Sequence, residues 1–462
     1  MADRHPRARR AVRHRIARTV LLLVAPLAVV PLAAQDRAPV ALTLGEAARL
    51  AARQGAAAQA AQLRVTQAES RVAQRRADLL PQVNGAVQVA DRTFNSATLG
   101  IDIPAPPGQP PFFNPDGEVL GPVPTSDVRG TIRQTLLDPA VLARLRAARG
   151  QVAASAADVA TNELQVAAQA GQAYIQAQRA ERILAARGAD SVLAAALLTI
   201  AQNQLRAGTG VVLDVTRAQS QLSAIRAQLI AARNDRDKSQ LALRRALNLP
   251  LDQPVITADS LDAAEELAVA DVATAVDAAI RTRPEVRALT AQAQAARLAE
   301  IAVQAERWPS LGLVADNGFI GGGRTFGNLL NTYAWGVQLS VPVFDGARRE
   351  ARIREQEAVQ RELELRRGDA AAQVATELRS ALLDADAARE QVAAARERVA
   401  LAEQEVAQAR SRFTAGVTGN LDVTQALLSL STARTQFVDA LAARQQARLA
   451  VARAQGTITA LR

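Results

Sequence analysis

The sequence has no cysteine among its 462 residues, and its two histidines, His5 and His14, both stand near the N-terminus. The absence of cysteine excludes disulfides, thiol nucleophiles, thiolate metal sites and a lipid anchor on an N-terminal cysteine. If the first residues are removed, both imidazoles leave with them, and the commonest general base is missing as well. Catalysis that uses carboxylates alone stays open.

Aromatic residues are also scarce, at 3% of the chain, and Lys238 is the only lysine. Alanine, leucine, arginine, glutamine and glutamate fill stretches of tens of residues that contain no proline. These residue types favour helix, so the composition predicts long helices with small contact residues. The apolar share of 49% is enough for burial and argues against disorder.

Residues 1–34 have the pattern of a secretory signal peptide. Arginines are frequent before residue 19, and an apolar run follows from Thr19 to Leu32, with small residues up to Ala34. A transmembrane anchor is the alternative, but the run is short for a full span. Without this segment the net charge falls from +10 to about +4, so the charge balance does not point to nucleic acid.

The rest of the chain has no apolar stretch of about 20 residues, which predicts that no transmembrane helix follows the signal. If the remaining chain spans a membrane, it must do so with β-strands, because backbone groups in lipid have to pair within the protein.

The chain contains an internal duplication. Residues 208–226 read GTGVVLDVTRAQSQLSAIR and residues 416–434 read GVTGNLDVTQALLSLSTAR, an ungapped match at an offset of 208. Upstream, Leu80-Pro81 corresponds to Trp308-Pro309, and Leu137-Asp138 corresponds to Phe344-Asp345. Both halves therefore follow one plan.

Each half has the same predicted order: a helix that ends near a proline, two strands, a very long helix, a glycine turn and a second helix. The first repeat (35–247) is expected to have a helix at 43–79, strands at about 82–90 and 127–137, the long helix 139–206 and a helix at 211–247. The second repeat (271–462) is expected to have a helix at 271–307, strands at about 310–319 and 333–343, the long helix 346–413 and a helix at 420–455. A connecting segment at 248–270 joins them.

The four predicted strands alternate between apolar and polar residues. The fourth is the clearest, with Tyr333, Trp335 and Val337 on one side and Gly336 and Gln338 on the other. Alternation over about 9–11 residues suits a strand with one face in lipid, although a half-buried strand of a soluble sheet alternates in the same way. Attachment to very long helices in a secreted chain favours the membrane interpretation, which places Tyr333 and Trp335 in an interfacial aromatic belt.

Four strands cannot close a barrel, and lipid does not tolerate an open sheet edge. Three copies supply twelve strands, which are enough to enclose a wet lumen. The expected fold is mainly helical with a transmembrane β-barrel, built by a trimer of the duplicated unit. The proline-rich segment from Ile103 to Pro124 stands where a long extracellular loop is expected.

Apolar residues recur every seven positions in both long helices. They are Leu145, Val152, Val159 and Val166 in the first helix, and Leu378, Ala385, Val392, Val399, Val406 and Phe413 in the second. This spacing indicates coiled-coil packing against neighbouring helices. A soluble coiled-coil rod has the same spacing, but it leaves the duplicated strand hairpins unexplained.

The layout and the two glycine turns resemble the TolC family of outer-membrane efflux channels (outer-membrane factors). The most specific motifs are Arg206-Ala207-Gly208 through Leu213-Asp214-Val215 and Ala415-Gly416 through Leu421-Asp422-Val423. The resemblance implies a homotrimer with a short β-barrel in the Gram-negative outer membrane and a long α-barrel in the periplasm. It also implies a passive duct, without enzymatic activity or cofactor, that meets a periplasmic adaptor (membrane fusion) protein and, through it, an inner-membrane pump of RND, ABC or MFS type.

The resemblance also implies site residues. An adaptor-contacting tip is implied at Arg206, Gly208, Thr209, Gly210, Gly416, Val417, Thr418 and Gly419. A periplasmic gate is implied at Asp422, with Gln425 beside it and Asp214 at the matching place in the first repeat. Gln425 stands where some members have a second acid, which implies a weaker anionic ring. A carboxylate that only favours a helix start through the helix dipole explains Asp422 equally well.

Three other functions compete with this interpretation. A periplasmic adaptor subunit should have one helical hairpin flanked by β-rich domains, whereas this chain has two equivalent hairpins. A secreted alanine-rich coiled-coil structural protein or adhesin has no need of strand hairpins. A secreted enzyme is disfavoured because histidine and cysteine are missing. No motif names the exported substrate.

Overall fold

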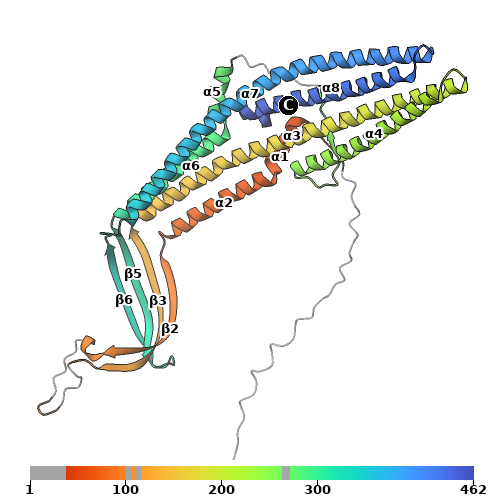
Figure 1. Cartoon of the computed structure of the whole chain (residues 1–462). Coiled ribbons are helices and arrows are strands. Elements are labelled where there is room, and N and C mark those ends of the chain that lie inside the picture. Colours follow the sequence, from red (N-terminus) through yellow and green to blue (C-terminus); the bar gives the residue numbers. More distant parts are fainter. Residues whose placement is uncertain (1–37, 100–105, 110–115, 263–270, 462) are drawn as a thin grey trace, which may run out of the picture. The chain divides into compact units, whose positions relative to one another are not determined.

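The computed structural model describes residues 38–99, 106–109, 116–262 and 271–461. The expected signal peptide at 1–34 lies outside the described residues, as do parts of the proline-rich segment and of the connecting segment. Within the described residues, the two repeats contribute equivalent elements in the same order (Figure 1).

One β-hairpin from each repeat joins a four-stranded antiparallel sheet. Its strands are β2 (Gln82–Asn95), β3 (Val119–Leu137), β5 (Ser310–Gly322) and β6 (Leu330–Ser340), in the order β2-β3-β5-β6. The repeats meet between β3 and β5, which leaves β2 and β6 as the edges. β2 and β3 are longer than the sequence predicts, because their backbone pairing continues past a bulge after Arg92 as far as Asn95 and Val119.

Each hairpin leads into a helix of more than sixty residues. These helices are α3 (Pro139–Arg206) and α7 (Arg348–Thr414). The Asp138 carboxylate caps α3 by accepting hydrogen bonds from the N–H groups of Ala140 (2.8 Å) and Val141 (3.2 Å). α7 starts two residues after the predicted 346, because Gly346 (φ 73°) and Ala347 (φ 63°) adopt left-handed conformations.

Two return helices run back along the long ones. They are α4 (Val212–Ala246) and α8 (Asn420–Gln455). α3 packs against both α4 and α8, and α8 also packs against α7, so the helices form the row α4-α3-α8-α7 (Figure 1). The interior of this row holds a cluster of buried residues from both repeats, which includes Leu197, Val423 and Leu430.

The helices predicted at 43–79 and 271–307 are each interrupted. The observed helices are α1 (Leu44–Gln54) and α2 (Ala56–Ala77) in the first repeat, and α5 (Val272–Thr282) and α6 (Pro284–Gln304), followed by the 3-10 turn η2 (Ala305–Arg307), in the second. The first break is at Gly55, where a Cβ atom would lie 2.5 Å from the Val166 side chain. The second break is at Arg283, where Pro284 starts a new helix. Next to the sheet the helices form the row α2-α3-α6-α7.

A pairing between distant segments completes the core. β1 (Val40–Leu42) pairs in parallel with β4 (Val255–Thr257) from the connecting segment. Beneath this pair, the fully buried Tyr174 donates a hydrogen bond from its hydroxyl to the Leu42 carbonyl oxygen at 2.8 Å. The connecting segment is therefore fixed to the N-terminal end of the first repeat.

The Pro139–Arg206 helix, α3, contains a segment that is apolar enough to cross a membrane by length and composition alone, with mean hydropathy 1.6 and 17% of the segment buried. It is the only such helix among the described residues. The sequence has no continuous apolar run of that length, and the segment is apolar because an alanine-rich helix carries few charges. α3 packs against other helices on both sides, so this apolar segment contributes to helix packing.

Candidate functional site

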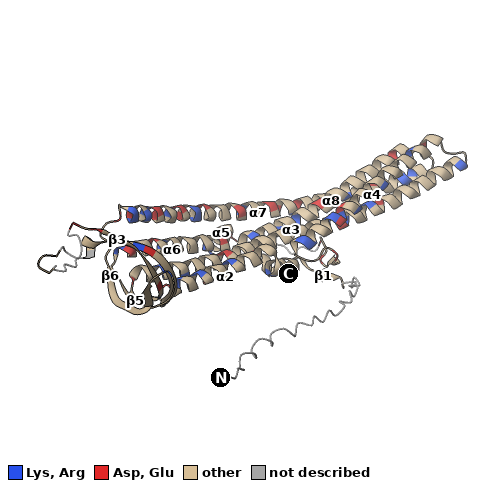
Figure 2. Ribbon diagram, turned by 90° about the horizontal axis from the view of Figure 1, so that it is seen from below, with Lys and Arg blue, Asp and Glu red and all other residues tan. Residues whose placement is uncertain are grey.

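The strand register sorts the alternating residues onto two faces of the sheet. Val83 on β2 lies opposite Ile132 on β3. Ile132 lies opposite Ala315 on β5, which in turn lies opposite Trp335 on β6. One face is therefore apolar across all four strands, and its large side chains are exposed, with Trp335 at 75%. Figure 2 shows that most of the sheet carries no charge. An exposed apolar face of this width suits contact with lipid.

The opposite face carries a charged network. Arg129 on β3 forms an ion pair with Asp316 on β5. The same guanidinium lies 3.2 Å from the Asp127 carboxylate and donates a hydrogen bond to the Thr332 hydroxyl on β6 at 3.3 Å. Because these charges cost free energy in hydrocarbon, this face belongs toward water.

Large apolar residues also stand exposed at the four joints between the sheet and the helices. They are Leu80, Leu137, Trp308 and Phe344, and they are related in pairs by the duplication. Phe344 is the most open, at 85%. The expected belt residues Tyr333 and Trp335 are exposed on the apolar face but lie in the interior of β6, not at its ends. The joint residues were not predicted as a group, although the paired motifs Leu80-Pro81 and Trp308-Pro309 mark two of the four joints.

The two glycine turns close the far ends of the helical hairpins with the same geometry. Gly208 (φ 75°) and Gly416 (φ 72°) both adopt the left-handed conformation. Their N–H groups donate to the carbonyl oxygens three residues back at 3.1 Å and 3.0 Å, and in each turn the next N–H reaches the carbonyl five residues back at 3.0 Å. This pattern satisfies carbonyl groups that the end of a helix leaves unpaired.

Side-chain contacts bring the two turns together. Gln204 donates from its amide to the Phe413 carbonyl oxygen at 2.8 Å. The buried Asn420 donates to the Asp214 carbonyl oxygen at 2.9 Å. Neither Gln204 nor Asn420 was predicted as a site residue from the sequence. The signal for Asn420 is its departure from the repeat, because the equivalent residue is Val212.

The expected tip residues differ in exposure. Arg206, Gly208, Thr209, Gly416, Val417 and Gly419 are exposed, whereas Gly210 and Thr418 are partly covered. The Arg206 guanidinium contacts the Asn203 side chain. The Thr418 hydroxyl is buried and has no hydrogen-bond partner among the described residues. The turns thus present mostly backbone and small side chains to a partner.

Asp214 and Asp422 occupy the same place in the two repeats, the third residue of α4 and of α8. Asp422 and Gln425 are exposed and lie three residues apart on one side of α8, whereas Asp214 is partly buried. Within the described part of the chain, no hydrogen bond or ion pair involves the Asp422 carboxylate. Asp422 can therefore present its charge to water or to a passing ion.

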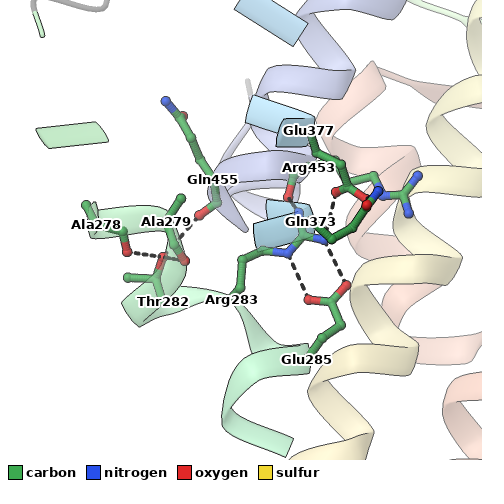
Figure 3. Close-up of polar contacts among 9 residues, drawn as sticks. All are labelled: Ala278, Ala279, Thr282, Arg283, Glu285, Gln373, Glu377, Arg453 and Gln455. Carbon is green, nitrogen blue, oxygen red and sulfur yellow. Dashed lines mark hydrogen bonds and ion pairs between the residues drawn. The ribbon is translucent and has the colours of Figure 1, made fainter. Parts of the chain in front are cut away.

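A buried charged cluster holds the break between α5 and α6 (Figure 3). The Arg283 guanidinium, 3% exposed, donates to Glu285 at 2.8 Å and 3.0 Å and to Glu377 on α7 at 3.1 Å. It also donates to the Arg453 carbonyl oxygen near the end of α8 at 2.8 Å. These contacts satisfy the guanidinium and connect three helices, so the cluster is a structural joint. In the described ranges, no three His, Asp or Glu side chains form a metal-binding group.

Comparison with known proteins agrees with this arrangement. The family model described as outer membrane efflux protein matches residues 48–249 and 275–457, once in each repeat. The alkaline protease secretion protein AprF of Pseudomonas aeruginosa is 30% identical over 161 residues, which cover 33% of this chain and only 33% of the length of AprF.

Several solved outer-membrane channels have a similar fold. The OprN channel gives a TM-score of 0.71 at 17% identity, with 90% of each chain covered. The CmeC channel of Campylobacter jejuni gives 0.69 at 17% identity, covering 90% of this chain and 85% of CmeC. The open state of the MtrE channel of Neisseria gonorrhoeae gives 0.69 at 18% identity, with coverage of 89% and 88%.

The expected fold class is confirmed by these structures. The family match extends over most of the chain and follows the duplication that the sequence revealed. The chain therefore belongs to the outer membrane efflux protein family.

Proposed function

We propose that this chain is the outer-membrane exit duct of a tripartite efflux or type I secretion system. Three copies form a passive channel, a periplasmic adaptor docks on its tip, and an inner-membrane pump of RND, ABC or MFS type supplies the work. Family membership supports the proposal, because this is a family of outer-membrane efflux channels and not of enzymes.

The observation that carries the proposal is the four-stranded sheet with one apolar face, one polar face and two open edges. Among the described residues, β2 pairs only with β3 and β6 pairs only with β5. Unpaired edge groups are not tolerated in lipid, so the edges of different copies must pair. Three copies give twelve strands, with the Arg129 network facing a wet lumen and Trp335 facing lipid.

The exposed apolar residues support contact between this sheet and the lipid of the outer membrane. Tyr333 and Trp335 contact the acyl chains or their boundary, and Trp308 and Phe344 lie where the sheet meets the helices. Aromatic rings favour the interface between hydrocarbon and water. The joints therefore mark the periplasmic surface of the membrane.

The tip carries the two remaining roles. The turns at Gly208 and Gly416 offer the adaptor a surface of backbone and small side chains, and Asp422 lines a periplasmic gate with Gln425. Asp214 is partly buried and modulates opening. The likeness to an alkaline protease secretion protein over a third of its length supports a protein cargo, and a small-molecule cargo is the alternative.

The proposal is tested with protein purified in mild detergent. Mass measurement should give a trimer, and planar bilayers should show discrete conductance steps that disappear after heat denaturation. In cells, a bifunctional crosslinker should join the trimer to an adaptor, whose identity would also distinguish the pump types. A stable folded monomer without conductance would overturn the proposal.

A further inference from the structure

Next to the sheet, the helix row α2-α3-α6-α7 has a hollow of about 530 Å³ on one of its sides (Figure 1). All four helices line the hollow, α2 at Arg75, α3 at Arg144, α6 at Ala299 and α7 at Arg352. A row of helices that all border one hollow must curve around it. When copies of the proposed trimeric channel, on which this step rests, close the row into a ring, the hollow faces the lumen. The opposite side of each helix then faces outward.

Four arginines lie on that outward side. Two residues along a helix correspond to about 200° around it, so a residue two positions from one that lines the hollow points away from the hollow. This relation holds for Arg76 on α2, Arg146 and Arg149 on α3, and Arg297 on α6. All four are exposed. We call them the outer arginines.

The outer arginines lie close to the joint between the helices and the sheet. Arg76 is the last residue but one of α2. Arg146 and Arg149 follow the start of α3 by seven and ten residues, which puts them at most about 10 Å and 15 Å from the joint. Arg297 lies at the level of Arg149, because its neighbour on α6 packs there against Gly150.

Exposed apolar residues precede the outer arginines on the way from the sheet. Leu137 is exposed at the joint, and Leu142 is exposed one turn before Arg146 on the same side of α3. Beyond Arg149, the exposed residues on that side of α3 are Ala153, Ala156 and Ala160. The positive charge is therefore confined to a band directly after the apolar zone, where the headgroups of a bilayer begin.

The chain itself does not neutralise this band. Within the described residues, none of the four guanidiniums has an ion pair or a hydrogen bond. α3 has no acidic residue before Asp158, and Glu69 on α2 is seven residues farther from the joint than Arg76. Glu300, three residues after Arg297, accepts a hydrogen bond within α6 instead, at 2.7 Å.

The arginines on the hollow side of the same helices have carboxylate partners. The pairs are Arg75–Asp78 at 3.6 Å, Arg144–Asp138 at 3.8 Å and Arg352–Glu306 at 2.7 Å. Among the arginines that line the hollow, only Arg71 has no such partner in the described part of the chain. The same stretch of helix thus pairs most of its positive charge toward the lumen and leaves it unpaired toward the outside.

We propose that the outer arginines form a binding surface for anionic phospholipid headgroups at the periplasmic surface of the outer membrane. The surface continues the lipid contact of the apolar sheet face and fixes how deep the barrel sits in the bilayer. Arginine suits this partner because its planar guanidinium donates two parallel hydrogen bonds to phosphate oxygens.

The four arginines contribute in two ways. The headgroup region of one leaflet is about 5–7 Å thick, and flexible arginine side chains extend the reach of the helices toward it. Arg76 and Arg146 therefore contact headgroup phosphates directly. Arg149 and Arg297 act from farther away, within the Debye length of about 10 Å at 0.1 M salt.

Lipid binding is measured on the detergent-purified trimer by native mass spectrometry, which also verifies that each variant is assembled. Phosphatidylglycerol is the anionic probe and phosphatidylcholine the zwitterionic one. Wild type should bind phosphatidylglycerol more tightly. Arg76→Gln with Arg146→Gln should weaken its binding by about twentyfold, or about fivefold for each arginine, and leave phosphatidylcholine binding unchanged.

The matched control removes two arginines at the same level on the hollow side. Arg71→Gln with Arg75→Gln should bind phosphatidylglycerol as wild type does. Ionic strength separates the two kinds of contribution, because the Debye length falls to about 4 Å in about 0.5 M ammonium acetate. Arg149→Gln with Arg297→Gln should weaken binding in dilute buffer and have no effect at this higher concentration.

Equal affinity of the wild type for the two lipids would overturn the inference, and so would equal losses in the outer and the control variants. Displacement of phosphatidylglycerol by soluble polyglutamate at the same charge concentration would assign the surface to a soluble anionic polymer and refute the lipid assignment. A trimer that conducts but does not distinguish the lipids refutes this inference alone. A folded monomer without conductance refutes the proposed function.

Discussion

Arg283 and Glu377 are joined by a hydrogen bond of 3.1 Å between a guanidinium that is almost fully buried and a carboxylate on the neighbouring long helix. Arg283 is also the single residue between the end of helix α5 and the start of helix α6. One side chain therefore fixes the position of a helix start against both helices of the second hairpin (Figure 3).

Replacing Arg283 with methionine should lower the free energy of unfolding by about 2–4 kcal/mol, because it leaves two partly buried carboxylates and the Arg453 carbonyl oxygen without their donor. Thermal unfolding in detergent checks this. Arg281→Met, at an exposed arginine two residues away, is the matched control and should change the stability little. Equal effects of the two substitutions would contradict the assigned role of Arg283.

Replacing Gly208 or Gly416 with leucine should abolish efflux while trimers still insert. Both glycines have positive φ, and a side chain there is strained by about 1 kcal/mol even though no atom lies within 4 Å of the added Cβ. The new side chain would also occupy the surface proposed for the adaptor. Export assays and adaptor crosslinking are the measurements, with the exposed Gly368→Leu on α7 as control. Unchanged export together with unchanged crosslinking would argue against the tip assignment.

Replacing Asp422 with alanine should raise single-channel conductance and reduce block by multivalent cations. Three carboxylates that converge in confined water act strongly on passing ions. Asp214→Ala, at the equivalent but partly buried position, should change opening and leave cation block as it is. Both variants should lose at most about 1 kcal/mol of stability through the helix dipole. Identical cation block in wild type and Asp422→Ala would mean that no such ring exists.

The buried Tyr174 leads us to expect that the protein loses folding stability at alkaline pH. Burial raises the pKa of its phenol above the usual value, so the folded protein keeps a proton that the unfolded chain releases above about pH 10. The wild type should therefore lose stability as pH rises above that value. Tyr174→Phe should be about 1 kcal/mol less stable at neutral pH but should lose less above pH 10. Tyr333→Phe, at the exposed second tyrosine, should keep the wild-type slope in chemical denaturation.

The sequence was most informative where a local pattern repeats. The duplication at residues 208–226 and 416–434 predicted that the two turns are equivalent, and Gly208 and Gly416 indeed share one backbone conformation. Strict alternation in the fourth strand predicted a two-faced sheet, because side chains alternate along any strand. These features depend on residues that are close together in the chain.

The features that the sequence did not predict depend on distant contacts. At the break, Gly55 has no room for a side chain, because the Ala51 carbonyl oxygen and the Val166 side chain, more than a hundred residues away, each lie 2.5 Å from where a Cβ atom would be. The β1–β4 pair and the Arg283–Glu377 contact also join segments that no local pattern relates. The hydrogen bonds of Gln204 and Asn420 join the two turns, and the sequence does not show that the turns are adjacent in space.

The duplication also sets the stoichiometry that any tip-binding partner can have. Each copy offers two turns with the same backbone, but Thr209 and Gly210 follow the first glycine, whereas Val417 and Thr418 follow the second. A trimer thus presents six turns of two chemical kinds in alternation. A partner that distinguishes the two kinds of turn would bind as three copies, and one that does not would bind as six copies.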